Sequence, residues 1–386
     1  MNKSIEPTGK IVPPADSPIH TLNDHVLLNV FYLYRLNIPD EYDEEGNINA
    51  NWASHRWWYK LAQVCQRWRH LILASPSRLG LHLLCTHGVP IANMLAHSPQ
   101  LPLAICYDDL DRETTEEDDD GISLALRHSD CVHYISFFLP SPKLWKFITI
   151  MDEEFPILER MYIWSRTEGD ISLVLPRTFQ APHLRHFALW SIALPIGSPL
   201  LTTTVGLVTL MLTEIPPFAY FSPNHLLTWL SLMPQLENLW IRFYSPLPNH
   251  EVERQSLNTP FMTQITLPNL RQFVFRGVSA YLERLLARIR ARLLTELEIV
   301  LFNQLTYTVP RLSQFMATLE ALSFDRIQLA FCNDSAEFKT VQLEERGGHS
   351  FSIKVMCRHL DWQVSSAIQI LTALLRGSEN RFVSIT

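Results

Sequence analysis

The sequence has little of what many enzymes and nucleic-acid-binding proteins carry. It has 12 glycines in 386 residues, with neither a glycine-rich phosphate loop nor a Gly-x-Ser-x-Gly motif, which argues against nucleotide-dependent and serine-hydrolase chemistry. The formal net charge is −7, whereas nucleic-acid-binding domains usually carry a basic patch or stripe. We therefore expect no nucleic acid as a partner.

Signals for secretion and membrane insertion are also lacking. Residues 1–20 contain no apolar segment flanked by basic residues, so no signal peptide is indicated. The six cysteines are scattered without Cys-x-x-Cys spacing, and we expect reduced thiols in the cytoplasm or nucleus. Residues 187–213 have no charged side chain over a length that spans a bilayer, but prolines, glycines and three successive threonines interrupt them. We interpret this stretch as two buried strands, and we expect no membrane association.

Catalytic and metal-binding patterns are scarce. His183 and His186 are three residues apart on an expected strand, which places them on opposite faces, whereas a metal site needs convergent ligands. The three carboxylates at 152–154 are contiguous rather than paired across a cleft, and Cys65 is interpreted as a packing residue. The acidic run 108–120 is predicted to be a solvated loop rather than a calcium site, because its carboxylates lack the spacing of a calcium loop. We expect no enzyme activity, no cofactor and no metal.

The first part of the chain has a helical pattern. Residues 1–18 are rich in proline and polar residues and are predicted to be disordered. Residues 19–86 are predicted to form a helical domain, in which Asn23 or Asp24 caps a first helix and a second helix covers about 57–73. The acidic loop 37–51 connects the two. A strand at 79–84, a short helix at 89–97 and a strand at 103–107 are expected to follow.

From residue 130 onward the sequence repeats. Apolar residues recur at i, i+3 and i+5 in units that begin at residues 132, 158, 184, 207, 236, 270, 294 and 324, which are 23–34 residues apart. Residues i+3 and i+5 of a strand point to one face, and stacking the strands in parallel buries that face continuously. Helical segments such as 279–293 lie between the strands. We predict an α+β or α/β fold over 87–386: a curved solenoid of divergent leucine-rich repeats with parallel strands on its concave face.

The end of the chain continues this pattern. We expect a strand at 351–355 and an amphipathic helix at 364–375. Phe382 and Ile385 have the spacing of the start of another repeat. Because the open end of a solenoid exposes apolar surface unless it is capped, we predict that the repeats are incomplete at the C-terminus, the alternative being a cap of a different kind.

Residues 22–71 resemble the F-box. That family opens with an apolar-x-x-x-apolar helix, here LNDHVLLNVF at 22–31, and closes with an apolar-x-x-Val-Cys-x-x-Trp-Arg segment, here LAQVCQRWRHL at 61–71. There are two departures: Asn23 replaces the usual proline, and the acidic loop lengthens a connection, which costs little entropy. With the repeats included, most of the chain resembles the large F-box family of mushroom-forming fungi.

The resemblance implies a substrate adaptor of a Skp–cullin–F-box ubiquitin ligase. Its partners are then a Skp-type adaptor, the cullin ligase and an unknown protein substrate, with the chain a monomer in the complex. Trp68 is the expected anchor, because interface energy concentrates in buried aromatic side chains. The expected adaptor-binding residues are Leu22, Val26, Leu27, Val30, Phe31, Leu61, Val64, Cys65, Trp68, Arg69 and Leu71.

The substrate is expected on the concave sheet. Residues at i+2, i+4 and i+6 of each repeat point away from the core, and they include tryptophans and arginines, which are enriched at interface hot spots. The predicted substrate-binding residues are Tyr162, Trp164, Trp190, Trp240, Arg242 and Arg276, with His186 and Gln272 beside them. The arginines favour an acidic or phosphorylated segment. The alternative for Trp164 and Trp190 is packing under a neighbouring loop.

Two other interpretations of the whole chain are open. The aromatic residues of the helical block, Trp57, Trp58 and Trp68, can be the core of a small cap on the repeats. The chain can also be a leucine-rich-repeat scaffold with no role in ubiquitin transfer. A unit of ~50 residues buries little of its own surface, which favours a partner for the excess apolar side chains. A scaffold has no need of the block at 22–71.

Overall fold

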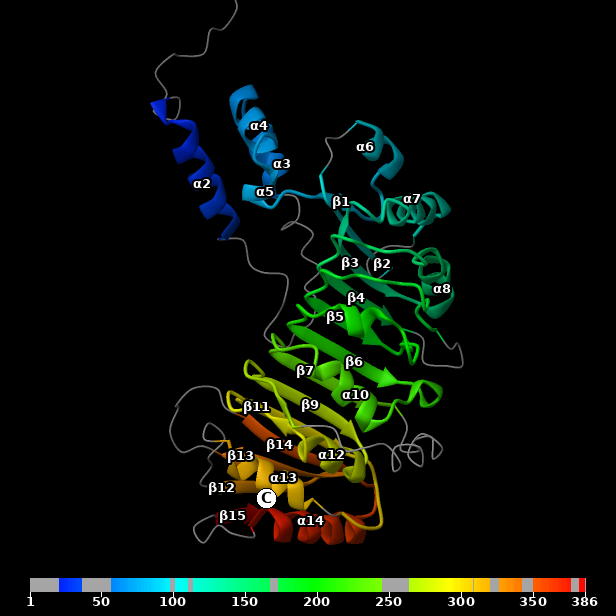
Figure 1. Ribbon diagram of the computed structural model, residues 1–386, viewed down its shortest axis with the longest axis vertical. Helices are drawn as coiled ribbons and strands as arrows, with labels where there is room; N and C mark the ends of the chain where they lie inside the picture. Colours follow the sequence, from blue (N-terminus) through cyan, green and yellow to red (C-terminus); the bar gives the residue numbers. More distant parts are fainter. Residues whose placement is uncertain are drawn as a thin grey trace, which may run out of the picture. The chain divides into compact units, whose positions relative to one another are not determined.

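The chain forms two compact units, Met1–Leu84 with Ser98–Pro102 (unit 1) and Cys85–His97 with Leu103–Thr386 (unit 2). The computed structural model describes residues 21–36, 57–97, 101–109, 114–166, 173–244, 264–307, 309–319, 326–341, 350–375 and 382–385 (Figure 1). The predicted disordered segment 1–18 and the acidic loop 37–51 lie outside these residues. We placed the domain boundary after residue 86, and the chain divides after Leu84.

Unit 1 contains the helices α2 (Asp24–Leu36), α3 (Trp57–Ala62), α4 (Gln66–Leu73) and α5 (Pro76–Leu79), and α2 packs against α4 and α5. The single helix predicted over 57–73 is wrong. Cys65 is extended and caps α4, its Sγ accepting a hydrogen bond from the backbone N–H of Trp68 at 3.5 Å. Arg69 Nε donates to the carbonyl of Ala62 at 3.1 Å and so satisfies the end of α3. The strand predicted at 79–84 is also shorter, since β1 is Leu83–Cys85.

Unit 2 contains a large, open, mostly parallel sheet. In spatial order its strands are β2 (Leu103–Asp108), β3 (Val132–Leu139), β4 (Arg160–Ser165), β5 (His186–Trp190), β6 (Thr209–Ile215), β7 (Asn238–Phe243), β9 (Gln272–Gly277), β11 (Glu296–Leu301), β14 (Ser350–Met356), β13 (Ser335–Val341), β12 (Arg326–Phe331) and β15 (Phe382–Ile385). Neighbours from β2 to β14 are parallel, as predicted. The predicted repeat at 324–329 departs from the prediction, because its strand β12 pairs antiparallel with β13. A separate parallel pair consists of β8 (Ile265–Thr266) and β10 (Ile289–Arg290).

The repeated apolar residues form the core of unit 2. On the strands from β3 to β11, the residues at i+3 and i+5 are no more than 2% exposed: Ile135, Phe137, Met161, Ile163, Phe187, Leu189, Leu210, Leu212, Leu239, Ile241, Phe273, Phe275, Leu297 and Ile299. Full burial of one such side chain contributes about 1.5–3 kcal/mol. This confirms the inward face that the sequence pattern predicted.

Helices cover that inward face. They are α6 (Ile91–His97), α7 (Glu116–Leu126), α8 (Ser141–Ile150), α9 (Leu200–Thr203), α10 (Pro223–Leu230), α12 (Ser279–Leu286), α13 (Pro310–Ala317) and α14 (Leu360–Leu375), with the 3₁₀ turn η1 (Pro217–Ala219). The ring of Phe147 on α8 lies 5.6 Å from Tyr107 and 5.4 Å from Phe137. In Figure 1, α10, α12 and α13 lie on the near side of the strands. The alternate strand residues therefore point to the opposite face, called the outer face below.

We predicted that the acidic run 108–120 is a loop, and this prediction is wrong for its second part, which is helical. Residues 110–113 are outside the described part, but α7 begins at Glu116, with Thr115 and Asp118 forming a reciprocal capping box. The buried carboxylate of Asp118 also accepts a hydrogen bond from the backbone N–H of Gly88 at 2.6 Å. Carboxylates in a first helical turn interact favourably with the free N–H groups and the helix dipole, so the charge density that indicated a loop instead starts a helix.

Two predicted helices have different bounds in the structure. The helix predicted over 279–293 ends at Leu286, where β10 follows, and α14 starts before the predicted residue 364. Residues 187–213 contain parts of β5 and β6, as predicted, with α9 between them. Within the described part of the chain, no helix combines the length and apolarity that a bilayer crossing requires.

Candidate functional site

Helix α2 is apolar on two opposite sides. Leu27, Leu28 and Phe31 point into unit 1 and are buried. Val26, Val30 and Leu33, at i, i+4 and i+7, are 38%, 46% and 56% exposed and form one line along the opposite side, called the α2 stripe below. A helix that is apolar around its circumference is ordinarily buried on all sides. The α2 stripe is therefore suited to a partner surface.

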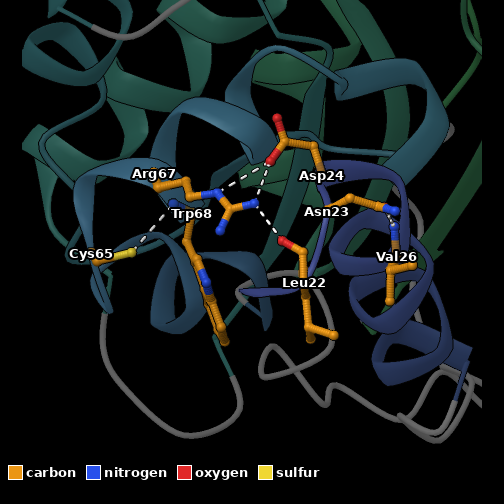
Figure 2. A network of polar contacts seen from close by, with 7 residues as sticks. All are labelled: Leu22, Asn23, Asp24, Val26, Cys65, Arg67 and Trp68. Atoms are coloured by element: carbon orange, nitrogen blue, oxygen red, sulfur yellow. Dashed lines mark hydrogen bonds and ion pairs between the residues drawn. The ribbon is translucent and has the colours of Figure 1, made fainter. Parts of the chain in front are cut away.

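Polar contacts fix the start of α2 (Figure 2). The Oδ1 of Asn23 accepts from the backbone N–H of Val26 at 2.9 Å, which confirms the predicted cap. Arg67 donates to Asp24 Oδ1 through Nε at 3.1 Å and Nη2 at 2.7 Å, and to the carbonyl of Leu22 at 2.6 Å. Ion pairs this exposed contribute about 0–1 kcal/mol. Their main effect is to set the position of α2 against α4.

The predicted adaptor-binding residues do not share one surface. Val26, Val30 and Val64 are exposed, whereas Leu27 and Phe31 are buried. Leu22, Leu61, Cys65, Trp68 and Leu71 are half-buried, and Arg69 is exposed. The Trp68 ring packs edge-on against Phe31, with ring centroids 4.8 Å apart. Trp68 therefore stabilises unit 1 itself, and Leu33, which the sequence reasoning missed, extends the exposed set.

Three aromatic rings follow one another on the outer face of unit 2. Phe138, Trp164 and Trp190 are register partners on β3, β4 and β5, and all three are half-buried. The ring centroids of Phe138 and Trp164 are 6.4 Å apart, and those of Trp164 and Trp190 are also 6.4 Å apart. We call these three residues the aromatic ladder. Tyr162, predicted beside it, is only 4% exposed and packs 6.0 Å from Tyr134.

The arginines of the outer face are paired within the sheet. Arg242 and Arg276 are register partners on β7 and β9. Arg242 reaches past β9 and donates to Glu298 on β11 at 3.0 Å, while Arg276 reaches past β7 and donates to Glu214 on β6 at 2.7 Å. The Nε atoms of both arginines are buried. An acidic ligand would therefore compete with a glutamate at each guanidinium, and it cannot approach either guanidinium through Nε.

Other predicted residues of the outer face are also linked together. Trp240 lies 5.0 Å below the guanidinium of Arg242 and donates through Nε1 to Gln272 at 2.7 Å. Gln272 in turn donates to Glu296 at 2.8 Å. Burial, with help from Arg160 and Arg185, lowers the pKa of His186 to about 4, so this imidazole is uncharged at neutral pH.

Replacing Arg276 with methionine is expected to lower the free energy of unfolding by about 1–2 kcal/mol, because the mostly buried carboxylate of Glu214 loses its ion-pair partner. The measurement is urea unfolding followed by circular dichroism. Arg271→Met, at an exposed position just before the same strand, should change stability by less than about 0.5 kcal/mol. Equal stability of Arg276→Met and the unaltered chain would instead mean that Arg276 is available to a partner.

A metal site requires several ligand side chains that converge on one point. Within the described ranges, no group of three or more His, Cys, Asp or Glu side chains is placed to hold a metal ion. A hollow of about 560 Å³ lies between α6 and the start of α7. Its buried carboxylate, Asp118, is already engaged by Thr115 and by the backbone of Gly88. This hollow therefore has no free buried acid for catalysis.

The chain matches no protein-family model, no curated protein and no solved structure.

Proposed function

We propose that the chain is the substrate adaptor of a Skp–cullin–F-box ubiquitin ligase. In this proposal unit 1 is an F-box domain, and the α2 stripe docks on a Skp-type adaptor. Unit 2 is a divergent leucine-rich-repeat solenoid whose outer sheet face binds a protein substrate. The observation that carries the proposal is the exposed α2 stripe, in a helical block that also contains the Val-Cys-x-x-Trp-Arg segment.

The local geometry of unit 1 supports the F-box assignment. Cys65 caps α4, Trp68 packs on Phe31, and Arg69 satisfies the end of α3. Cys65, Trp68 and Arg69 of the motif thus each have a structural task, whereas Val64 is exposed. The same packing leaves Val26, Val30 and Leu33 outside, where burying each against a partner is worth up to about 1.5–3 kcal/mol before association costs.

The arrangement of unit 2 supports the repeat assignment. Parallel strands recur at the predicted positions, and each buries the same two apolar positions beneath the helices. Repeats of this kind bury a continuous core only by stacking, and they present an extended face to partners. All six cysteines are free thiols, in keeping with the proposed cytoplasmic or nuclear location.

The alternative is a repeat scaffold without a role in ubiquitin transfer. It is favoured by the two departures from the F-box pattern, Asn23 in place of proline and the long segment 37–51. A scaffold gives no reason for an apolar stripe on α2. Adaptor binding therefore separates the two functions.

The test is co-expression of the full chain with a Skp-type adaptor and a cullin. We expect a stoichiometric complex of all three proteins on size-exclusion chromatography, formed only when the adaptor is present. A folded chain that elutes alone in the presence of both partners rejects the ligase proposal and leaves the scaffold.

A further inference from the structure

We propose that the aromatic ladder receives an extended, uncharged protein segment that crosses β3, β4 and β5 and places apolar side chains at alternate positions over Phe138, Trp164 and Trp190. Only the identification of this segment as part of the ligase substrate rests on the proposed function. An uncharged segment is proposed here in place of the acidic one that the arginines suggested in the sequence, because both arginines are paired with glutamates within the sheet.

The spacing of the rings matches an extended chain. Both steps of the ladder are 6.4 Å between ring centroids. An extended segment rises about 3.2–3.4 Å per residue, so its alternate side chains are about 6.4–6.8 Å apart. Neighbouring strands are only about 4.7–4.9 Å apart, so the rings are spread more widely than the backbones that carry them. Three alternate side chains therefore meet three rings with little accumulated mismatch.

The rings of the ladder are tilted against one another. The planes of Phe138 and Trp164 meet at 61°, and those of Trp164 and Trp190 at 42°, so the rings do not stack into a closed wall. Each ring is half-buried by the sheet. Rigid, partly buried aromatic side chains lose little conformational entropy on binding and are common interface hot spots.

Two charged residues beside the ladder in the described part of the chain, Arg166 and Glu214, are paired. Arg166 lies 5.7 Å from the Phe138 ring centroid and pairs with Asp109 at 3.1 Å. Thr213 lies beside Trp190 in register, and the next residue, Glu214, pairs with Arg276 at 2.7 Å. Because these charges of the described residues are already paired, a charged segment would lose hydration there and gain less from them than it would from unpaired charges, whereas an uncharged apolar segment gives up no charge hydration.

The backbone is constrained where the ladder ends. Ser191, which follows Trp190, has a φ of 58°, and Glu214 has a φ of 53°. Residues other than glycine rarely adopt this left-handed backbone conformation, and residues strained in this way cluster at functional sites. The backbone N–H of Ser191 donates to the carbonyl of Thr213 at 3.0 Å and so joins the ends of β5 and β6. This contact fixes the chain directly after Trp190.

The test is fluorescence anisotropy of the full chain with labelled synthetic peptides. The main probe has three leucines at alternate positions with serine between and beside them. Its matched control has the same composition with the leucines three residues apart, and two further peptides carry glutamate or arginine in place of leucine. We expect the alternating leucine peptide to bind at least tenfold more tightly than the three other peptides. Its affinity should fall at least tenfold in Trp164→Ala and in Trp190→Ser, and less than twofold in Arg242→Gln.

Several results would overturn the proposal. They are tighter binding of the glutamate peptide that depends on Arg242, binding of a soluble β-linked glucan oligosaccharide in place of peptide, or no peptide binding by the folded chain. Circular dichroism identifies any variant that fails to fold. If one of the two tryptophan variants does not fold, the other alone is sufficient for the test. Each variant is also titrated with a Skp-type adaptor. A tryptophan variant that loses peptide binding but still binds the adaptor shows that the ladder is the peptide site. If the chain binds the peptide through these tryptophans but does not bind the adaptor, only the ligase proposal is rejected.

Discussion

Replacing Val30 with glutamate is expected to abolish binding of a Skp-type adaptor while the chain stays folded. Val30 is at the centre of the α2 stripe and is 46% exposed, so its side chain contributes little to the interior of unit 1. In the complex the new carboxylate would be buried against apolar surface without a partner. A loss of at least about 2 kcal/mol, or roughly 30-fold in Kd, follows from the usual scale of interface hot spots.

The matched control is His25→Glu. His25 is exposed on the same helix, but it lies off the line of Val26, Val30 and Leu33, so a carboxylate there should leave adaptor binding within about threefold. Calorimetric titration gives the affinity, and thermal unfolding monitors the fold. Trp68→Ala should lower both the affinity for the adaptor and the unfolding temperature, because this ring packs on Phe31. If Val30→Glu binds the adaptor as tightly as His25→Glu, the α2 stripe is not the interface.

Replacing Leu210 with aspartate is expected to unfold the neighbouring strands of unit 2. Leu210 is fully buried on β6, in register with Phe187 on β5 and Leu239 on β7. An unpaired carboxylate in this core is expected to cost about 4 kcal/mol or more, a large share of the roughly 5–15 kcal/mol by which most domains are stable.

Met211→Asp is the control for this prediction. Met211 is the next residue on β6, half-buried on the outer face, so its replacement should cost much less. Urea unfolding followed by circular dichroism measures both, and limited proteolysis shows whether the strands beside β6 open. Equal midpoints for the two variants would contradict the burial of Leu210, and a lower midpoint for Met211→Asp would mean that the two faces of the sheet have been assigned the wrong way round.

The strands of unit 2 could be predicted because their signal is local and periodic. One apolar residue at i+3 and another at i+5 identify the buried face of each strand, and the structure buries both from β3 to β11. The segment at 324–329 carries the same spacing, yet β12 pairs antiparallel with β13. Strand direction depends on the connections, and the spacing of apolar residues within one strand contains no information on it.

Helix boundaries were harder to predict because they depend on single capping contacts. Cys65 interrupts the segment 57–73 through one hydrogen bond to the backbone of Trp68, and cysteine is not a residue expected at a cap. Thr115 and Asp118 start α7 inside an acidic run. There the Thr-x-x-Asp spacing resembles a capping box, a signal in the sequence that was not used in predicting a loop.

The candidate surfaces depend on contacts between distant residues. Arg67 meets Asp24 across 43 positions of the sequence, and Arg276 meets Glu214 across 62. Sequence reasoning placed Arg242 and Arg276 on the outer face, but it had no means of finding the glutamates that occupy them. The aromatic ladder was partly visible, since Trp164 and Trp190 were predicted to lie on this face. Its regular spacing became visible only with the register of the sheet.

The most direct test of the proposed function is calorimetric titration of the full chain with an isolated Skp-type adaptor. We predict saturable binding with one adaptor per chain, unchanged in His25→Glu and lost in Val30→Glu. A folded chain that shows no saturable binding at micromolar concentrations would contradict the assignment of unit 1 as an F-box.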